Sequence, residues 1–96
     1  YASAKGFVST VTRNMAKELA GDNIRVNAVA PGTIATDFHE RHSSDAHLNA
    51  ARASIPMGRL GTAEECVGAY VFLATDTLSG YVTGQIIEVN GGQLMP

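Results

Sequence analysis

The sequence has few of the features that define secreted, membrane or nucleic-acid-binding proteins. Its single cysteine, Cys66, excludes an internal disulfide and is typical of a reducing compartment, so we expect a cytoplasmic protein. Seven basic residues are scattered among nine acidic ones, which indicates no basic face for nucleic acid. No apolar run approaches the roughly 18–20 residues that span a bilayer, and no signal peptide is visible. We therefore expect neither a nucleic acid nor a membrane as partner.

The length of 96 residues and the hydrophobic fraction of 45% are typical of one small globular domain. The hydrophobic pattern predicts two main helices and two strands, which is an incomplete layer structure. A parallel pair of strands needs helices on both faces and further strands beside it. Because the chain also opens with Tyr inside a helical pattern, we expect a fragment whose domain begins before Tyr1.

The first third of the chain predicts a helix followed by a buried strand. Residues 1–20 carry apolar side chains at steps of three and four, which indicates an amphipathic helix. Gly21 is expected to end it in a left-handed conformation. Residues 24–30 form a nearly continuous apolar run that ends at Pro31-Gly32, as in a parallel strand covered on both faces.

The last third predicts a second helix and a second strand. Thr62 and Glu65 form a capping box that starts the helix. Its apolar positions are expected to be buried: Cys66, Val67, Ala69, Tyr70, Val71, Leu73 and Ala74. Residues 78–80 predict a turn, residues 85–89 predict the strand, and Asn90-Gly91-Gly92 closes it.

Between these parts lies a polar, weakly periodic segment, residues 37–55, which we call the lid segment. We predict a loop with one or two short helices, one of them over residues 46–53 after a cap at residues 43–45. The segment holds all three histidines, His39, His42 and His47. Their spacing is not that of a helical zinc pair, so we expect a solvated lid and no metal site.

Tyr1 and Lys5 are the first candidates for chemistry. In a helix they stand one turn apart on the same face. An ammonium close to a phenol favours the phenolate and lowers its pKa, which suits a general acid or base. Taken alone, the same pair is also compatible with a packed tyrosine at a helix start beside a solvated lysine.

Five ordered motifs resemble the C-terminal part of the short-chain dehydrogenase/reductase family. They are a Tyr-x-x-x-Lys pair, a strand that ends in Pro-Gly, the turn after it and two later segments. In this sequence they stand at Tyr1 and Lys5, 24–32, 33–36, 55–65 and 81–92. The resemblance covers nearly the whole chain, and the lid segment matches least.

The resemblance implies an α/β fold, the C-terminal part of a Rossmann-like doubly wound parallel sheet. Residues 1–96 would supply its last two strands, two long helices and a substrate lid, within a single NAD(P)-binding domain. It also implies an NAD(P)-dependent oxidoreductase, with NAD or NADP as cofactor, that interconverts a secondary alcohol and a ketone. Tyr1 would be its general acid or base, and Lys5 would assist Tyr1 and bind the nicotinamide ribose.

The resemblance further implies which residues contact the cofactor. The backbone of Ile34 would hold the nicotinamide carboxamide, with Pro31 and Gly32 shaping the approach. Thr33 belongs to the same turn, and the hydroxyl of Thr36 would reach the carboxamide or the diphosphate. By the same resemblance the protein would form a homo-oligomer, a tetramer or a dimer.

Other features of the family are absent from this sequence. The Gly-rich phosphate loop, the residue that selects NAD or NADP, and the catalytic Ser and Asn all precede the Tyr in the family. Two functional classes therefore remain: an active oxidoreductase, and a catalytically inactive relative with a cofactor-binding or structural role. Within the first, ketoacyl-thioester reductases and sugar or polyol dehydrogenases resemble the chain equally.

Overall fold

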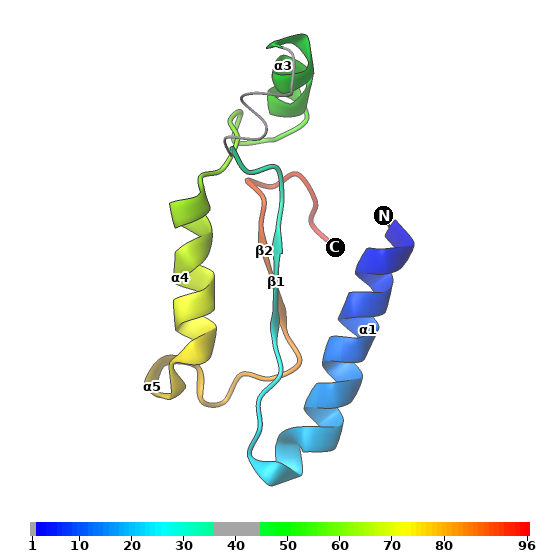
Figure 1. Ribbon diagram of the computed structural model, residues 1–96, viewed down its shortest axis with the longest axis vertical. Helices are drawn as coiled ribbons and strands as arrows, with labels where there is room; N and C mark the ends of the chain where they lie inside the picture. Colours follow the sequence, from blue (N-terminus) through cyan, green and yellow to red (C-terminus); the bar gives the residue numbers. More distant parts are fainter. Residues whose placement is uncertain (1, 36–44) are drawn as a thin grey trace. The chain divides into compact units, whose positions relative to one another are not determined.

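A computed structural model describes residues 2–35 and 45–96 of the chain (Figure 1). The elements follow in the order α1 (Ala2–Leu19), η1 (Ala20–Asp22), β1 (Ala28–Pro31), α3 (Asp45–Ala53), α4 (Ala63–Ala74), α5 (Asp76–Ser79) and β2 (Ile86–Val89). The chain divides into two units. The first unit comprises Tyr1–Val29 and Tyr70–Ile87, and the second comprises Ala30–Ala69 and Glu88–Pro96.

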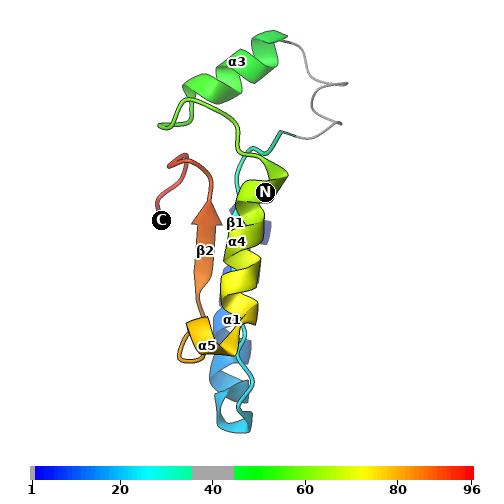
Figure 2. The same cartoon turned by 90° about the vertical axis from the view of Figure 1, so that its left-hand side faces the viewer.

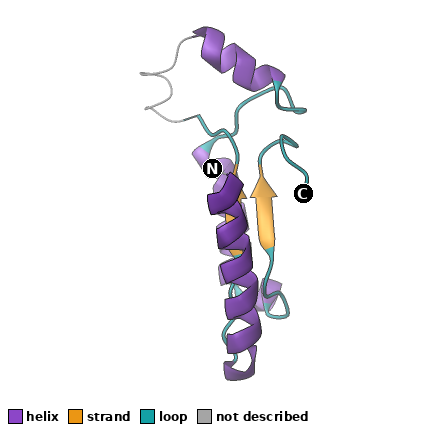
Figure 3. Cartoon of the chain, turned by 90° about the vertical axis from the view of Figure 1, so that its right-hand side faces the viewer, coloured by secondary structure: helices purple, strands orange, loops and turns teal. Residues whose placement is uncertain are grey.

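β1 and β2 pair as neighbours in one sheet, as predicted, and both are drawn in orange in Figure 3. The Gly84 amide donates to Val26 O at 2.8 Å, and the Ala28 amide donates to Gln85 O at 2.9 Å. The partners advance together along both segments, so the pairing is parallel. An α/β arrangement with a parallel strand pair therefore agrees with the fold class expected from the sequence.

β1 begins at Ala28 rather than at the predicted Ile24. In the residues before β1, side chains replace some of the main-chain hydrogen bonds of a regular strand pair. The Val26 amide donates to Thr83 Oγ1 at 3.1 Å. Asn27 Nδ2 donates to Val82 O at 3.0 Å, and Asn27 Oδ1 accepts from the Gln85 amide at 2.9 Å. The backbone groups are satisfied without a regular strand, which an apolar run alone does not reveal.

The predicted helix over residues 1–20 is confirmed as α1, but its end differs. The chain tightens into η1, and the left-handed residue is Asn23, with φ of 60°. Gly21 lies inside the tightened turn, so the expectation of a left-handed Gly21 was wrong. Asn tolerates this region better than most residues do, and its amide donates to Ala20 O at 3.0 Å.

The buried face of α1 is narrower than its apolar stripe. Ala16 is 3% exposed and Thr12 is 6% exposed, and the Thr12 hydroxyl donates to Val8 O at 2.7 Å. Ala16 faces Gly84, where an added Cβ would lie 3.4 Å from the Ala16 Cβ. By contrast, the large apolar side chains that widen the stripe are exposed: Phe7, Val8 and Met15.

α4 begins with the predicted capping box, in which the Thr62 amide donates to Glu65 Oε1 at 3.0 Å and the Glu65 amide donates to Thr62 Oγ1 at 3.3 Å. The predicted burial of its apolar face was wrong, because α4 has no buried residue in this chain. Val67, Tyr70 and Val71 are each more than half exposed, and Ala74 is exposed as well. Two short strands offer too little surface to cover a whole helix. None of the helices in the described part of the chain combines the length and apolar character needed to cross a membrane.

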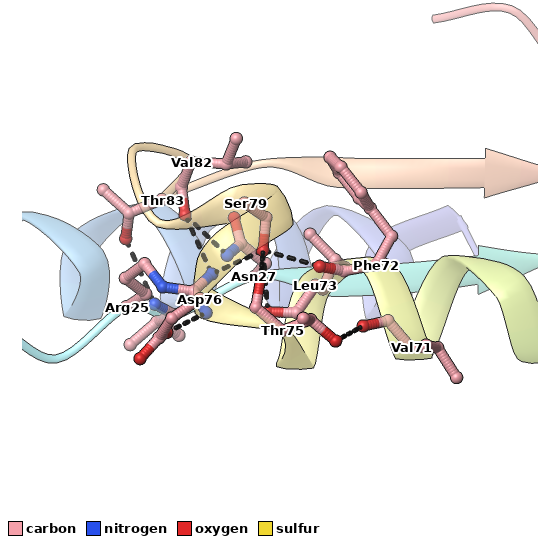
Figure 4. Close-up of polar contacts among 11 residues, drawn as sticks. Arg25, Asn27, Val71, Phe72, Leu73, Thr75, Asp76, Ser79, Val82 and Thr83 are labelled. Atoms are coloured by element: carbon pink, nitrogen blue, oxygen red, sulfur yellow. Dashed lines mark hydrogen bonds and ion pairs between the residues drawn. The ribbon is translucent and has the colours of Figure 1, made fainter.

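α5 follows α4 directly (Figure 2), where the sequence predicted only a turn at residues 78–80. Ser79, which is 1% exposed, ends this short helix, and its hydroxyl lies 2.6 Å from Phe72 O near the end of α4. The same oxygen accepts from Arg25 Nη1 at 3.1 Å (Figure 4). Arg25 also forms an ion pair with Asp76 at 2.8 Å. A cation thus stands where the carbonyl groups of α4 end, which is electrostatically favourable.

We expect Ser79→Ala to lower the free energy of unfolding by about 1–3 kcal/mol, because it removes a buried hydroxyl that bonds both Phe72 O and the Arg25 guanidinium. Asp76→Ala is the comparison, since the Asp76 side chain is 90% exposed and such pairs contribute about 0–1 kcal/mol. Urea denaturation of the intact protein measures both. Equal losses in the two variants would contradict the role assigned to Ser79.

Candidate functional site

The structure describes five of the seven predicted site residues. Tyr1 and Thr36 lie outside the described residues, as do His39 and His42 of the lid segment. Lys5 lies half-buried in the first turns of α1, in the first unit. Pro31, Gly32, Thr33 and Ile34 form the end of β1 and the turn after it, in the second unit. α3 confirms a helix within the lid segment; His47 is exposed on it, and the described residues contain no cluster able to hold a metal ion.

The turn at residues 31–35, which we call the cofactor turn after its predicted role, is held by main-chain hydrogen bonds. The Gly32 amide donates to Val89 O at 2.9 Å and so continues the pairing of β1 with β2. Two further bonds join the turn to Gly61: the Gly61 amide donates to Thr33 O at 3.1 Å, and the Ala35 amide donates to Gly61 O at 2.8 Å. Main-chain bonds on both flanks therefore fix the backbone of the turn.

These bonds determine which way the backbone of Ile34 faces. Ile34 and Gly61 form a parallel bridge, and its hydrogen bonds come from the residues on either side of Ile34. Along an extended chain, successive peptide groups point to opposite sides. The N–H and C=O of Ile34 itself therefore point away from Gly61, as a donor and an acceptor side by side. That pair complements a carboxamide, which also offers one donor group and one acceptor.

Position 32 requires a glycine because the backbone there lies very close to Asn90. A Cβ at Gly32 would lie 2.5 Å from the Asn90 Cβ and 2.9 Å from the Asn90 Cα. Real side chains do not approach this closely, and the Asn90 backbone cannot yield as a flexible side chain could. Glycine at position 32 thus lets the cofactor turn lie directly on the chain that follows β2.

Residues Asn90-Gly91-Gly92 form a turn, where the sequence predicted only the end of a strand. Gly91 and Gly92 have φ of 63° and 91°, which other residues rarely adopt. The Asn90 side chain closes the turn: its Oδ1 accepts from the Gly92 amide at 3.0 Å, and its Nδ2 donates to Leu94 O at 2.9 Å. The signal that could have found it was the Asn-Gly-Gly sequence itself, directly after an apolar strand.

The same turn packs against residues 55–61, which follow α3 and which we call the connector. A Cβ at Gly91 would lie 2.8 Å from Cγ2 of Ile55, which is 3% exposed. The Met57 amide donates to Gly91 O at 3.1 Å. The Asn-Gly-Gly turn therefore lies between the cofactor turn and the connector, and it contacts both.

An ion pair between Arg59 and Glu65 stands at the end of the connector. Arg59 Nη1 and Nη2 donate to the two Glu65 carboxylate oxygens at 2.7 and 2.8 Å. These bonds, with the Thr62 amide, lower the pKa of Glu65 from 4.5 to about 2. The pair borders a pocket of about 310 Å³, which is also lined by Thr33, Ile34, Met57, Gly61 and residues 88–92. Glu65 thus engages both terminal nitrogens of Arg59 beside the pocket.

Comparisons with known proteins show what the chain is similar to. Residues 1–93 match the family described as enoyl-(acyl carrier protein) reductase. The 3-oxoacyl-(acyl-carrier-protein) reductase FabG of Thermotoga maritima is 50% identical over 92 residues, which are 96% of this chain and 37% of the relative. The 3alpha-hydroxysteroid dehydrogenase of Mediterraneibacter gnavus is 44% identical over 91 residues, 95% of this chain and 36% of the relative.

A solved structure is similar over the whole chain. The NADH-dependent reductase A1-R′, described as responsible for alginate metabolism, superposes with a TM-score of 0.82 at 45% identity. The alignment covers 100% of this chain and 34% of that one. The chain thus spans little more than a third of the length of the relatives it matches.

We expect Gly32→Ala to displace the cofactor turn and to weaken dinucleotide binding by at least about tenfold, a change of about 1.4 kcal/mol in binding free energy. Gly21→Ala is the matched control, because nothing lies within 4 Å of a Cβ there and its φ is not positive. Fluorescence titration of the intact protein with NADH and NADPH measures the affinity. Unchanged affinity in Gly32→Ala would show that the contact with Asn90 can relax.

The ion pair predicts a specific pH dependence. Because the pKa of Glu65 is lowered on folding to about 2, its stabilisation is present above the ordinary value of 4.5 and is lost as the pH falls through about 2. In Arg59→Gln, NMR titration of the Glu65 carboxyl should give a midpoint shifted back toward 4.5. Arg52→Gln, whose guanidinium bonds Asn49 instead, should leave the Glu65 midpoint low. A low midpoint in Arg59→Gln would refute the assigned cause.

Proposed function

The chain belongs to the short-chain dehydrogenase/reductase family, and from this membership we propose that the protein is an NAD(P)-dependent oxidoreductase acting on a secondary alcohol or a ketone. The observation that carries the proposal is the family match over residues 1–93, which includes Tyr1 and Lys5. The nicotinamide cofactor supplies the hydride chemistry when it is bound. This chain's residues would bind and orient its nicotinamide end and handle the proton.

Tyr1 is proposed to exchange that proton at its phenolic oxygen. It would donate to the substrate oxygen when a carbonyl is reduced, and accept from it when an alcohol is oxidised. Lys5 lies four residues further along, and α1 already includes it. At that spacing its ammonium would favour the phenolate form of Tyr1 and offer a donor to the nicotinamide ribose.

The cofactor turn is proposed to hold the nicotinamide carboxamide. The Ile34 N–H and C=O point to the side opposite Gly61, so they can pair with the carboxamide oxygen and N–H. Pro31 and Gly32 would let this backbone come close to the ring, with Thr33 fixed beside them. Thr36 is assigned a hydroxyl contact to the carboxamide or the diphosphate.

The substrate is proposed to be a ketone or secondary alcohol contacted by the segment that contains α3. The relatives' names include acyl-carrier-protein thioesters and a steroid. These substrates share the carbinol or carbonyl group and little else. We also propose a cytoplasmic homo-oligomer, a dimer or tetramer; the exposed apolar side chains of α1 and α4 agree with further packing on those helices.

We expect Tyr1→Phe to lower kcat about 10²–10⁴-fold, because it removes only the transferable proton, while the dinucleotide Kd stays within about twofold. Tyr81→Phe is the control, since Tyr81 is fully exposed and should keep wild-type turnover. NADH and NADPH oxidation with a panel of β-keto esters, β-keto thioesters and ketoses measures kcat. Residual activity above about a tenth of wild type in Tyr1→Phe would exclude this role.

Lys5→Ala should differ from Tyr1→Phe by weakening both the rate and dinucleotide affinity, because the lysine has two proposed contacts. If the wild-type protein binds a dinucleotide but turns over no substrate of the panel, the alternative of an inactive cofactor-binding relative is favoured.

A further inference from the structure

A chain of side-chain hydrogen bonds joins the cofactor turn to the end of α3. The Thr33 hydroxyl donates to Gln93 Oε1 at 3.3 Å, and Gln93 Nε2 donates to Ser54 Oγ at 3.1 Å. The Ser54 hydroxyl in turn donates to Ala51 O at 2.7 Å, in the last turn of α3. All four residues belong to the second unit.

The direction of these bonds is fixed by the donors available. A hydroxyl has one proton, and that of Ser54 is engaged by the Ala51 carbonyl, so Ser54 Oγ must accept from Gln93. The amide nitrogen of Gln93 therefore faces Ser54 and its oxygen faces Thr33, where the hydroxyl of Thr33 donates. The Gln93 carboxamide, which has one donor group and one acceptor, satisfies both ends.

Each end of this series of hydrogen bonds lies in a part of the structure that other hydrogen bonds hold in place. Thr33 lies in the cofactor turn, and its carbonyl oxygen accepts from the Gly61 amide. Ser54 directly follows α3, and its amide donates to Ala50 O and Ala51 O at 3.2 and 3.1 Å. Gln93 is positioned by the Asn-Gly-Gly turn, since its own amide donates to Asn90 O at 3.1 Å.

We propose that Gln93 is a positioning residue that couples the cofactor turn to α3. Dinucleotide binding at the turn would then order α3. The inference rests on the proposed function, because it takes the turn as the nicotinamide contact. A displacement of Thr33 changes the position of the Gln93 amide, and the same amide holds the last turn of α3. Without Gln93 the side-chain link between the turn and the helix is lost.

Gln93→Glu is the sharpest variant. It keeps the size of the side chain and an acceptor for Thr33, but a carboxylate has no proton to give to Ser54. Gln85→Glu is the matched control, because Gln85 is exposed and its side chain makes only a 3.5 Å contact to Thr83 O. Ser54→Ala removes the acceptor at the other end and should reproduce the effect of Gln93→Glu. The double variant should then be no worse than either alone, as for residues in one network.

The readout is hydrogen–deuterium exchange in the intact protein, with and without saturating NADH or NADPH. We expect the dinucleotide to slow exchange of the α3 amides at least about threefold in wild type, and this slowing to vanish in Gln93→Glu and Ser54→Ala. Dinucleotide Kd should stay within about twofold, and the substrate KM should rise about three- to tenfold with little change in kcat.

The possible outcomes separate the two proposals. If α3 is protected equally in wild type and Gln93→Glu, the coupling role is overturned while the oxidoreductase proposal stands. If dinucleotide binds wild type without slowing exchange in α3, the coupling is overturned in the same way. If wild type binds neither dinucleotide, both proposals are overturned. A similar loss of protection in Gln85→Glu would mean that any added charge has this effect, and it would also overturn the assignment to Gln93.

Discussion

The second unit depends on the close approach of Gly32 to Asn90. With 2.5 Å between a Cβ at position 32 and the Asn90 Cβ, no other residue fits at position 32 unless the backbone moves. The contact fixes the distance between the end of β1 and the turn after β2. Asn90 can lie there because its amide closes its own turn through Gly92 and Leu94. Gly91 and Gly92 supply the positive φ values that bring this turn against Ile55 and Pro56. The backbone geometry of a few residues therefore places the cofactor turn, the connector and Gln93 relative to one another.

The parts that the sequence predicted well are those decided by local chemistry. The capping box at Thr62 and Glu65, the helix of residues 2–19 and the strand before Asn90 each follow from a short pattern, and the structure contains all three. The boundary errors have local causes as well. Asn27 and Thr83 satisfy backbone groups where a strand was predicted, and Asn23 replaces Gly21 as the left-handed residue.

The expectations that failed, or that missed a feature, concern contacts between residues distant in sequence. Burial of the apolar face of α4 depends on how much sheet lies beside it, and periodicity carries no such information; Tyr70 and Val71 are therefore exposed despite a helical pattern that indicates a core face. The bond from Gln93 to Ser54 spans 39 positions and joins two polar residues with no distinctive spacing. The candidate cofactor turn was found through family resemblance, because the reason for Gly32 lies in Asn90, far along the chain.

The cofactor turn and α3 are built on different physical principles. Main-chain bonds to Val89 and Gly61 fix the turn, so the donor and acceptor of Ile34 keep their direction whatever its side chain is. α3, in contrast, has no buried residue in this chain, and side-chain hydrogen bonds through Ser54 and Gln93 connect its end to the turn. Exposed positions accept substitution at little cost in stability. A backbone-defined turn with an exchangeable helix beside it would allow one nicotinamide contact to serve the different substrates that the relatives' names describe. The side-chain link through Gln93 would keep that exchangeable helix responsive to the shared cofactor.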